Sequence, residues 1–215
     1  MFCSNECRDM AVKKYHKYDC VIMESLQGSA SLLIAPRLLF MALSTFDDSI
    51  EKLEEFLSKY EDSTSTVFDF DFSDPTNPDN AKNLLLAAYC LCRSNKKFPL
   101  DAQESILKSH PILKDTLKTH DKFIRKFFLR QAQICDSSIH GIFAHRLKKE
   151  DLTNMNSIAA FNLLQETTGS GCFPFAALLN HSCAPNAMRT NIDGKVAIVM
   201  IRPVTAGAQI FDSYR

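Results

Sequence analysis

The amino-acid sequence predicts an α+β protein with a mostly helical body and a small β region at the carboxyl end. Apolar residues recur at helical spacing through much of residues 48–134. Near the carboxyl end, two runs rich in β-branched residues are joined by Asp193-Gly194. This dipeptide is a strong hairpin signal, because both central residues of the tight turn need a positive φ angle.

Four helices are expected in the helical body. The first follows the capping candidates Asp47 and Ser49, and a stretch with two prolines and several turn formers, residues 63–79, predicts a loop with one short extended piece. The expected helices span 48–60, 80–93, 106–117 and 123–134. The last helix carries an aromatic stripe that we expect to pack in a core rather than to bind a cofactor, namely Phe123, Phe127 and Phe128.

The pattern changes near Glu166 and becomes that of short extended segments. The glycine-rich stretch 167–171 (TTGSG) is expected to be a turn, followed by an extended piece over 172–175. Beyond it, Pro203 and Gly207 are expected to turn the chain into its final strand. The expected strands span 186–192, 195–201 and 209–211.

Composition limits the class of protein and its compartment. The 215 residues contain 25 Lys plus Arg and 25 Asp plus Glu, so no overall basic field indicates nucleic-acid binding. The first ten residues lack the apolar core of a signal peptide, and the best apolar run is interrupted by Pro36 and Arg37, so no membrane segment is expected. We therefore expect a cytoplasmic or nuclear protein, whose eight cysteines would be thiols or metal ligands.

Four of the first twenty residues are potential metal ligands. Cys3 and Cys7 are four residues apart, as are His16 and Cys20, so each pair would lie on one face of a helix and could chelate zinc. One continuous helix would point the two pairs in opposite directions, toward different ions. The alternative is a set of surface thiols with a solvated histidine.

This segment, CSNECRDMAVKKYHKYDC, resembles the second half of the zinc finger called MYND. In that finger two zinc sites interleave, which accounts for opposed half-sites at Cys3/Cys7 and His16/Cys20. The resemblance implies zinc binding and a proline-containing peptide as a possible partner of the finger. It also implies that the sequence begins in the middle of a domain.

The stretch LLNHSCAPN, residues 178–186, places an imidazole and a thiol two residues apart. A nucleophilic Cys/His site is disfavoured, because His181 and Cys183 are too close in the chain to form an oriented nucleophile and base. We expect these side chains to contact different neighbours. A metal-dependent hydrolase is also disfavoured, since no His/Asp/Glu set has the spacing of an open metal site.

The tract from Asn156 to Asn186, with Tyr214 on a later strand, resembles the SET domain of protein lysine methyltransferases. Together with the half-finger, it is similar to the SET and MYND domain family. The resemblance divides the chain into a partial finger (1–20), a helical body inserted in the SET domain (21–155) and the carboxyl part of a SET-type β region (156–215).

The resemblance also implies roles for individual residues. Tyr214 matches the tyrosine whose hydroxyl faces the transferred methyl group, and Cys183 matches a ligand of a third zinc. Ala177 stands where a small hydroxyl residue is expected. The positions that match contacts to the methyl donor S-adenosylmethionine are Asn156, Ala177, Leu179, Asn180 and His181, and those that match the lysine channel are Ile158 and Phe211.

These matches imply a protein lysine methyltransferase that uses S-adenosylmethionine and acts on a histone or another protein. We expect the sequence to be part of a larger enzyme, because the family's glycine-rich turn, first finger half and post-SET cysteines are not in it. The alternative is a non-catalytic interaction module, in which the finger recruits a partner and the SET remnant is a scaffold.

Overall fold

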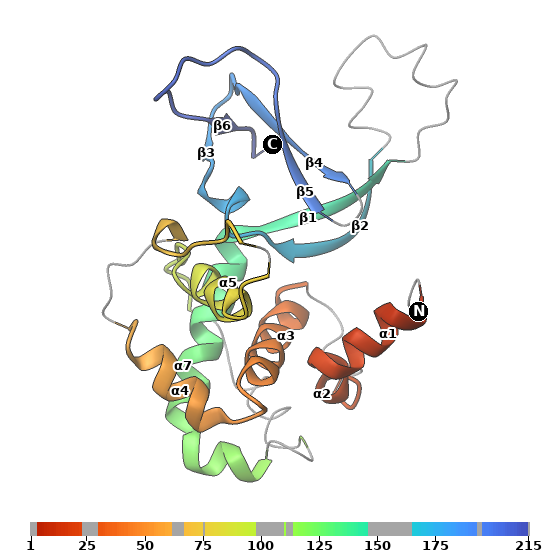
Figure 1. The fold of residues 1–215 in the computed structure, drawn as a ribbon, viewed down its shortest axis with the longest axis vertical. Helices are drawn as coiled ribbons and strands as arrows, with labels where there is room; N and C mark the ends of the chain where they lie inside the picture. Colours follow the sequence, from red (N-terminus) through yellow and green to blue (C-terminus); the bar gives the residue numbers. More distant parts are fainter. Residues whose placement is uncertain are drawn as a thin grey trace. The chain divides into compact units, whose positions relative to one another are not determined.

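The computed structural model describes residues 4–22, 30–61, 67–74, 76–97, 110, 114–145, 165–192 and 195–214. The chain divides into two units, Met1–Ser138 and Ile139–Arg215. The first unit is helical and the second consists mainly of short strands (Figure 1). This confirms the expected α+β class.

The helical unit begins with an almost unbroken helical segment. Helix α1 (Asn5–Ala11) continues into a π-helical stretch, Val12–His16, and then into α2 (Lys17–Asp19). The other described helices of this unit are α3 (Ala30–Thr45), α4 (Ile50–Ser58), the short 3-10 helix Val67–Asp69, α5 (Asn80–Tyr89) and α7 (Lys114–Ser138).

Helix α3 lies at the centre of this unit and contacts α2, α4, α5 and α7 (Figure 1). Pro36 lies inside it, so one intrahelical hydrogen bond is missing. The helix continues to Thr45, and its Leu39, Phe40 and Leu43 are completely buried. No helix in the described part of the chain combines the length and the apolar character needed to cross a membrane.

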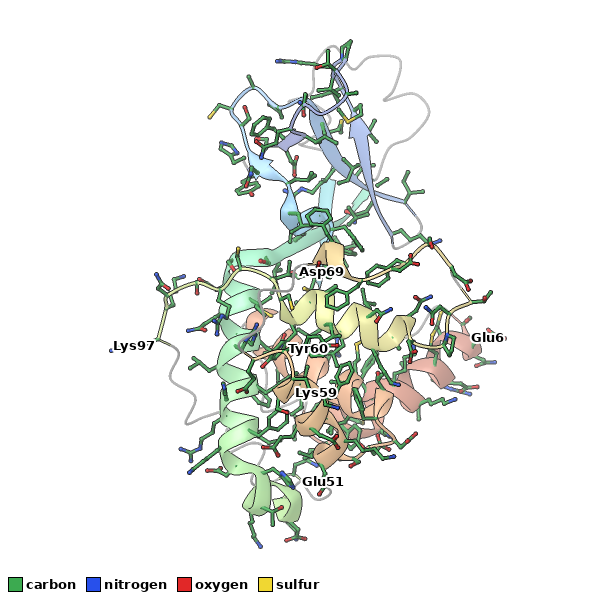
Figure 2. The ribbon with its side chains drawn as sticks, turned by 60° about the vertical axis from the view of Figure 1, so that its left-hand side comes forward. Glu6, Glu51, Lys59, Tyr60, Asp69 and Lys97 are labelled. Carbon is green, nitrogen blue, oxygen red and sulfur yellow. The ribbon has the colours of Figure 1, made fainter. Side chains whose placement is uncertain are left out.

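Aromatic rings fill much of the core around α3. The Tyr18 and Phe40 rings stack with centroids 5.3 Å apart, and the buried His110 ring bonds through Nε2 to the carbonyl oxygen of Tyr18 at 2.9 Å. Another series of neighbouring rings runs through Tyr60, which is labelled in Figure 2: Phe46, Phe56, Tyr60 and Phe70. The predicted stripe is in the core, as expected, since it is almost fully buried: Phe123, Phe127 and Phe128.

The first predicted helix is confirmed as α4, and its start shows why. The Ser49 hydroxyl oxygen accepts a hydrogen bond from the Lys52 backbone N–H at 3.2 Å, which satisfies one of the unpaired donors of the first turn. The other capping candidate, Asp47, precedes the helix with a positive φ of 55°. The apolar side of α4 is buried through Ile50, Leu53 and Leu57.

The prediction of separate helices over 106–117 and 123–134 is confirmed where the structure describes them, because helical geometry is interrupted between the two. The segment labelled α7, Lys114–Ser138, consists of two helices joined at a kink, where His120 has non-helical angles (φ −120°, ψ 23°). The kinked residue has a partner in α4, because the His120 ring nitrogens lie 2.6 Å from Glu54 Oε2 and 3.2 Å from Glu51 Oε1. Glu51 is labelled in Figure 2.

The described residues of the second unit form three two-stranded sheets. β1 (Ile139–His145) pairs antiparallel with β2 (Gln165–Cys172), and β4 (Ala187–Ile192) pairs antiparallel with β5 (Lys195–Met200). β3 (Asn180–His181) and β6 (Phe211–Asp212) are parallel, and the 3-10 helix Ala176–Leu178 precedes β3. The β4–β5 pair confirms the predicted hairpin strands, and β6 takes the place of the expected final strand.

The prediction of a turn over 167–171 is wrong, because these residues lie inside β2. Strand β1, which the sequence did not predict, supplies their partner. Gly171 has a steric role in this strand: a Cβ atom there would come within 2.7 Å of the Phe173 ring. The glycine therefore permits close packing within a strand.

Candidate functional site

The parallel pair β3–β6 brings the LLNHSCAPN motif to the carboxyl end of the chain. Asn180 lies opposite Phe211, and His181 opposite Asp212. The Ser182 backbone N–H donates a hydrogen bond of 2.9 Å to the Asp212 carbonyl oxygen just beyond this register. Two predicted cofactor contacts and a predicted channel residue are therefore neighbours in space.

Tyr214 follows β6 and forms two hydrogen bonds to the same motif. Its hydroxyl donates a hydrogen bond to the Leu179 carbonyl oxygen at 2.6 Å. Its backbone N–H donates to His181 Nδ1 at 3.1 Å, and the His181 and Tyr214 ring centroids are 5.3 Å apart. The phenol is thus held in one orientation, although the residue remains 59% exposed.

The expectation that His181 and Cys183 contact different neighbours is wrong. His181 Nε2 lies 3.4 Å from Cys183 Sγ. Because Nδ1 accepts the Tyr214 N–H, a neutral His181 ring carries its proton on Nε2 and donates it toward the sulfur. The imidazole therefore connects the thiol to the Tyr214 main chain, and this arrangement gives no general base directed at the thiol.

Asn186, the last residue of the motif, holds the segment that leads into β6. Its side-chain amide donates to the Gln209 carbonyl oxygen at 3.0 Å, and its Oδ1 accepts the Phe211 N–H at 2.8 Å. Sequence reasoning assigned no role to this residue. The feature of the sequence that could have indicated a role is its position directly after Pro185, at the end of the polar motif.

A cluster of charged and polar side chains includes a residue of β6, and the sequence did not predict it. Arg189 of β4 forms an ion pair with the buried Asp212 and donates through Nη1 to His140 Nδ1 of β1. Burial, followed by the nearby Arg189 guanidinium, lowers the pKa of His140 to about 4, although the Asp212 carboxylate opposes this shift. His140 is therefore neutral at pH 7 and can accept the arginine N–H.

The low pKa of His140 predicts a loss of stability in mild acid. In the unfolded chain a histidine titrates near pH 6.5, so between about pH 6.5 and pH 4 the unfolded state binds a proton that the folded state does not. The free energy of unfolding should fall across this window by about 2 kcal/mol, after allowance for partial exposure. Urea unfolding at a series of pH values measures the change.

The matched control is His140→Asn, whose side-chain oxygen can replace Nδ1 as the acceptor but does not titrate. The wild type and this variant should differ in slope between pH 6.5 and pH 4 and run parallel above it. Identical slopes in the two proteins would contradict the assignment.

The remaining predicted site residues fall into two groups. Among the described ones, Ala177 is half-buried and donates its N–H to the Phe173 carbonyl oxygen at 3.0 Å, whereas Asn180 is exposed. The Asn180 side chain makes no hydrogen bond within the described part of the chain. The others lie outside the described residues: Cys3, Asn156 and Ile158.

The described finger residues lie along the first helical segment. Cys7 is in α1, His16 ends the π-helical stretch and Cys20 directly follows α2. His16 Nδ1 lies 2.8 Å from Oδ1 of the fully buried Asp19, whose other oxygen is 2.7 Å from Arg37 Nε. Over the described residues, no three His, Cys, Asp or Glu side chains are grouped to hold one metal ion.

Comparisons with known proteins indicate the family of this chain. A family model described as the SET domain matches residues 20–215. The N-lysine methyltransferase SMYD2-B of Xenopus laevis is 26% identical over 102 residues, and the match covers 47% of this chain and 22% of that protein. The chain belongs to the SET domain family.

Proposed function

We propose that the protein is an S-adenosylmethionine-dependent protein lysine methyltransferase. The observation that carries this proposal is the β3–β6 pairing, which places Leu179, Asn180 and His181 beside Tyr214. Membership of the SET domain family and the similarity to an N-lysine methyltransferase support the same activity. Asn156 and Ile158 belong to the proposed site through the resemblance alone.

The residues around β3 suit the binding of a cofactor with both polar and apolar parts. The exposed Asn180 amide offers a donor and an acceptor that no described side chain uses. Leu179 and Ala177, both half-buried, precede it and supply an apolar wall. In this proposal Asn180 and His181 hold the cofactor, which supplies an activated methyl group on a sulfonium.

The proposed chemistry needs positioning more than acid–base groups. The neutral ε-amine of the substrate lysine would displace the sulfur at the methyl carbon, and the methylated ammonium would then lose a proton to solvent. Tyr214 would orient the amine through its hydroxyl oxygen, whose proton is donated to Leu179. Phe211, which pairs with Asn180, would line the lysine channel.

The amino-terminal segment is proposed as part of a MYND finger that binds zinc and, through it, a proline-containing peptide. The contact between His16 Nδ1 and Asp19 supports metal binding, because a carboxylate on one ring nitrogen fixes the tautomer in which the other can coordinate an ion. Cys3, Cys7 and Cys20 would be the other ligands on this segment. Cys183, which faces His181 Nε2–H, would bind a separate zinc as a thiolate.

Titration of the full-length protein with S-adenosylmethionine tests the function. We expect Asn180→Ala to weaken binding by about tenfold, as for the loss of one or two directed hydrogen bonds. Asn95→Ala is the matched control, because Asn95 is an exposed asparagine of the helical unit and its replacement should leave the affinity unchanged.

Isothermal titration calorimetry gives the affinities, and transfer of a labelled methyl group to lysine-containing proteins gives the activity. A wild-type protein that binds no S-adenosylmethionine would overturn the proposed activity. The interaction module would then be the better description of this chain.

A further inference from the structure

The peptide group between Ser213 and Tyr214 is held at both ends. Arg189 Nη2 donates to the Ser213 carbonyl oxygen at 3.4 Å, while the Tyr214 N–H donates to His181 Nδ1 at 3.1 Å. Because a peptide group is planar, contacts at its C=O and its N–H together fix the orientation of the plane. The direction in which Tyr214 leaves the main chain follows from that plane.

Arg189 can perform this role because three of its nitrogens have different partners. Nε forms the ion pair with Asp212, Nη1 donates to His140 and Nη2 reaches Ser213. The guanidinium is planar, so two of these contacts determine where the third nitrogen points. A lysine ammonium at this position could keep the ion pair but could not hold all three partners in one plane.

Asp212 anchors the arginine to β6 itself. Its side chain is 5% exposed, its Oδ1 accepts the Ser213 N–H at 2.8 Å, and its carbonyl oxygen accepts the Ser182 N–H at 2.9 Å. The Ser213 N–H therefore holds the carboxylate, and the bond from Ser182 holds the Asp212 main chain beside the motif. A buried ion pair of this kind contributes little net stability, and its better-documented use is to select one arrangement.

We propose that Arg189, oriented by Asp212 and His140, is a positioning residue that sets the direction of the Tyr214 phenol. The effect of this residue on catalysis depends on the proposed methyl transfer, whereas the geometry of its contacts does not. Arg189, Asp212 and His140 lie on three different strands, β4, β6 and β1, so their contacts form only when these strands have assembled.

Fluorine NMR of the full-length protein labelled with 3-fluorotyrosine tests the geometry without any need for activity. The chain contains five tyrosines, and Tyr214→Phe identifies the Tyr214 signal among the chain's resonances. In Arg189→Lys we expect the Tyr214 signal to shift or broaden while the other tyrosine signals stay in place. Arg202→Lys, at an exposed arginine of the same unit, is the matched control and should change none of them.

Asp212→Asn provides a second variant if Arg189→Lys does not fold. It keeps an oxygen that can accept the Ser213 N–H but removes the charge that holds Arg189, so a smaller change of the Tyr214 signal is expected. If Arg189→Lys folds and its Tyr214 signal is unchanged, the positioning role is refuted. If Arg189→Lys does not fold, an unchanged Tyr214 signal in folded Asp212→Asn refutes it.

Kinetics separate this inference from the proposed function. We expect kcat of Arg189→Lys to fall by about 10- to 100-fold, as for a small misplacement of a reacting group, while KM for S-adenosylmethionine changes less than about twofold. If the wild-type protein transfers no methyl group but its Tyr214 signal still changes in the Arg189 variant, the activity is refuted and the positioning role is upheld. An unchanged kcat together with an unchanged signal would refute the positioning alone.

Discussion

Tyr214→Phe is expected to lower kcat for methyl transfer in the full-length protein by about 100-fold or more, with the affinity for S-adenosylmethionine nearly unchanged. The substitution removes the hydroxyl that donates to the Leu179 carbonyl at 2.6 Å and that would orient the substrate amine. The ring and the backbone bond to His181 remain, so the site should keep its shape. Initial rates with methyl-labelled cofactor measure the effect.

The matched control for this experiment is Tyr60→Phe. Tyr60 packs between Phe56 and Phe70 in the helical unit, so the same hydroxyl is removed from a tyrosine outside the candidate site. Its kcat should equal that of the wild type. A Tyr214→Phe protein that keeps more than about half of the wild-type rate would show that the phenol does not take part in the transition state.

Local signals explain which parts of the fold the sequence could predict. The β4–β5 strands and α4 were predictable because a two-residue linker and a serine cap act on their immediate neighbours. β1 and the strand character of residues 167–171 were not, because each depends on pairing with a partner far along the chain. Glycines in that pairing look like turn formers when only the local sequence is read.

The candidate site divides in the same way. The resemblance to the SET domain predicted roles for Leu179, Asn180, His181 and Tyr214, and the structure brings these four together. Arg189 could not be identified, because an arginine on a hairpin strand is ordinarily a solvated residue. Its importance comes from Asp212 and His140, which reach it from two other strands.

The kink in α7 shows a third case, in which the sequence predicted two helices but not the contact that lies at the break between them. Apolar spacing predicted helices on both sides of His120, and helical structure is present on both sides where the chain is described. Helical geometry is interrupted at His120, whose ring contacts Glu51 and Glu54 of α4. A tertiary contact of this kind leaves no periodic signal.

Phe40→Ala is expected to reduce the free energy of unfolding of the helical unit by about 3–5 kcal/mol, the usual cost of removing a buried aromatic side chain. Phe40 is completely buried in α3, and its ring lies 5.3 Å from the Tyr18 ring and 6.0 Å from the His110 ring. Its loss would leave a cavity where the amino-terminal helical segment meets the core. Equilibrium urea unfolding, followed by the helical circular dichroism signal, gives the value.

Met41→Ala is the matched control, because Met41 directly follows Phe40 in the same helix and is 39% exposed. Both substitutions replace a larger side chain with the best helix former, so the intrinsic helix propensity rises or stays equal in each. The Met41 variant should lose less than about 1 kcal/mol, since its side chain is already partly in water. Equal losses of unfolding free energy in the two variants would mean that the face of α3 bearing Phe40 does not pack in the core. Tyr18 would then pack against another surface.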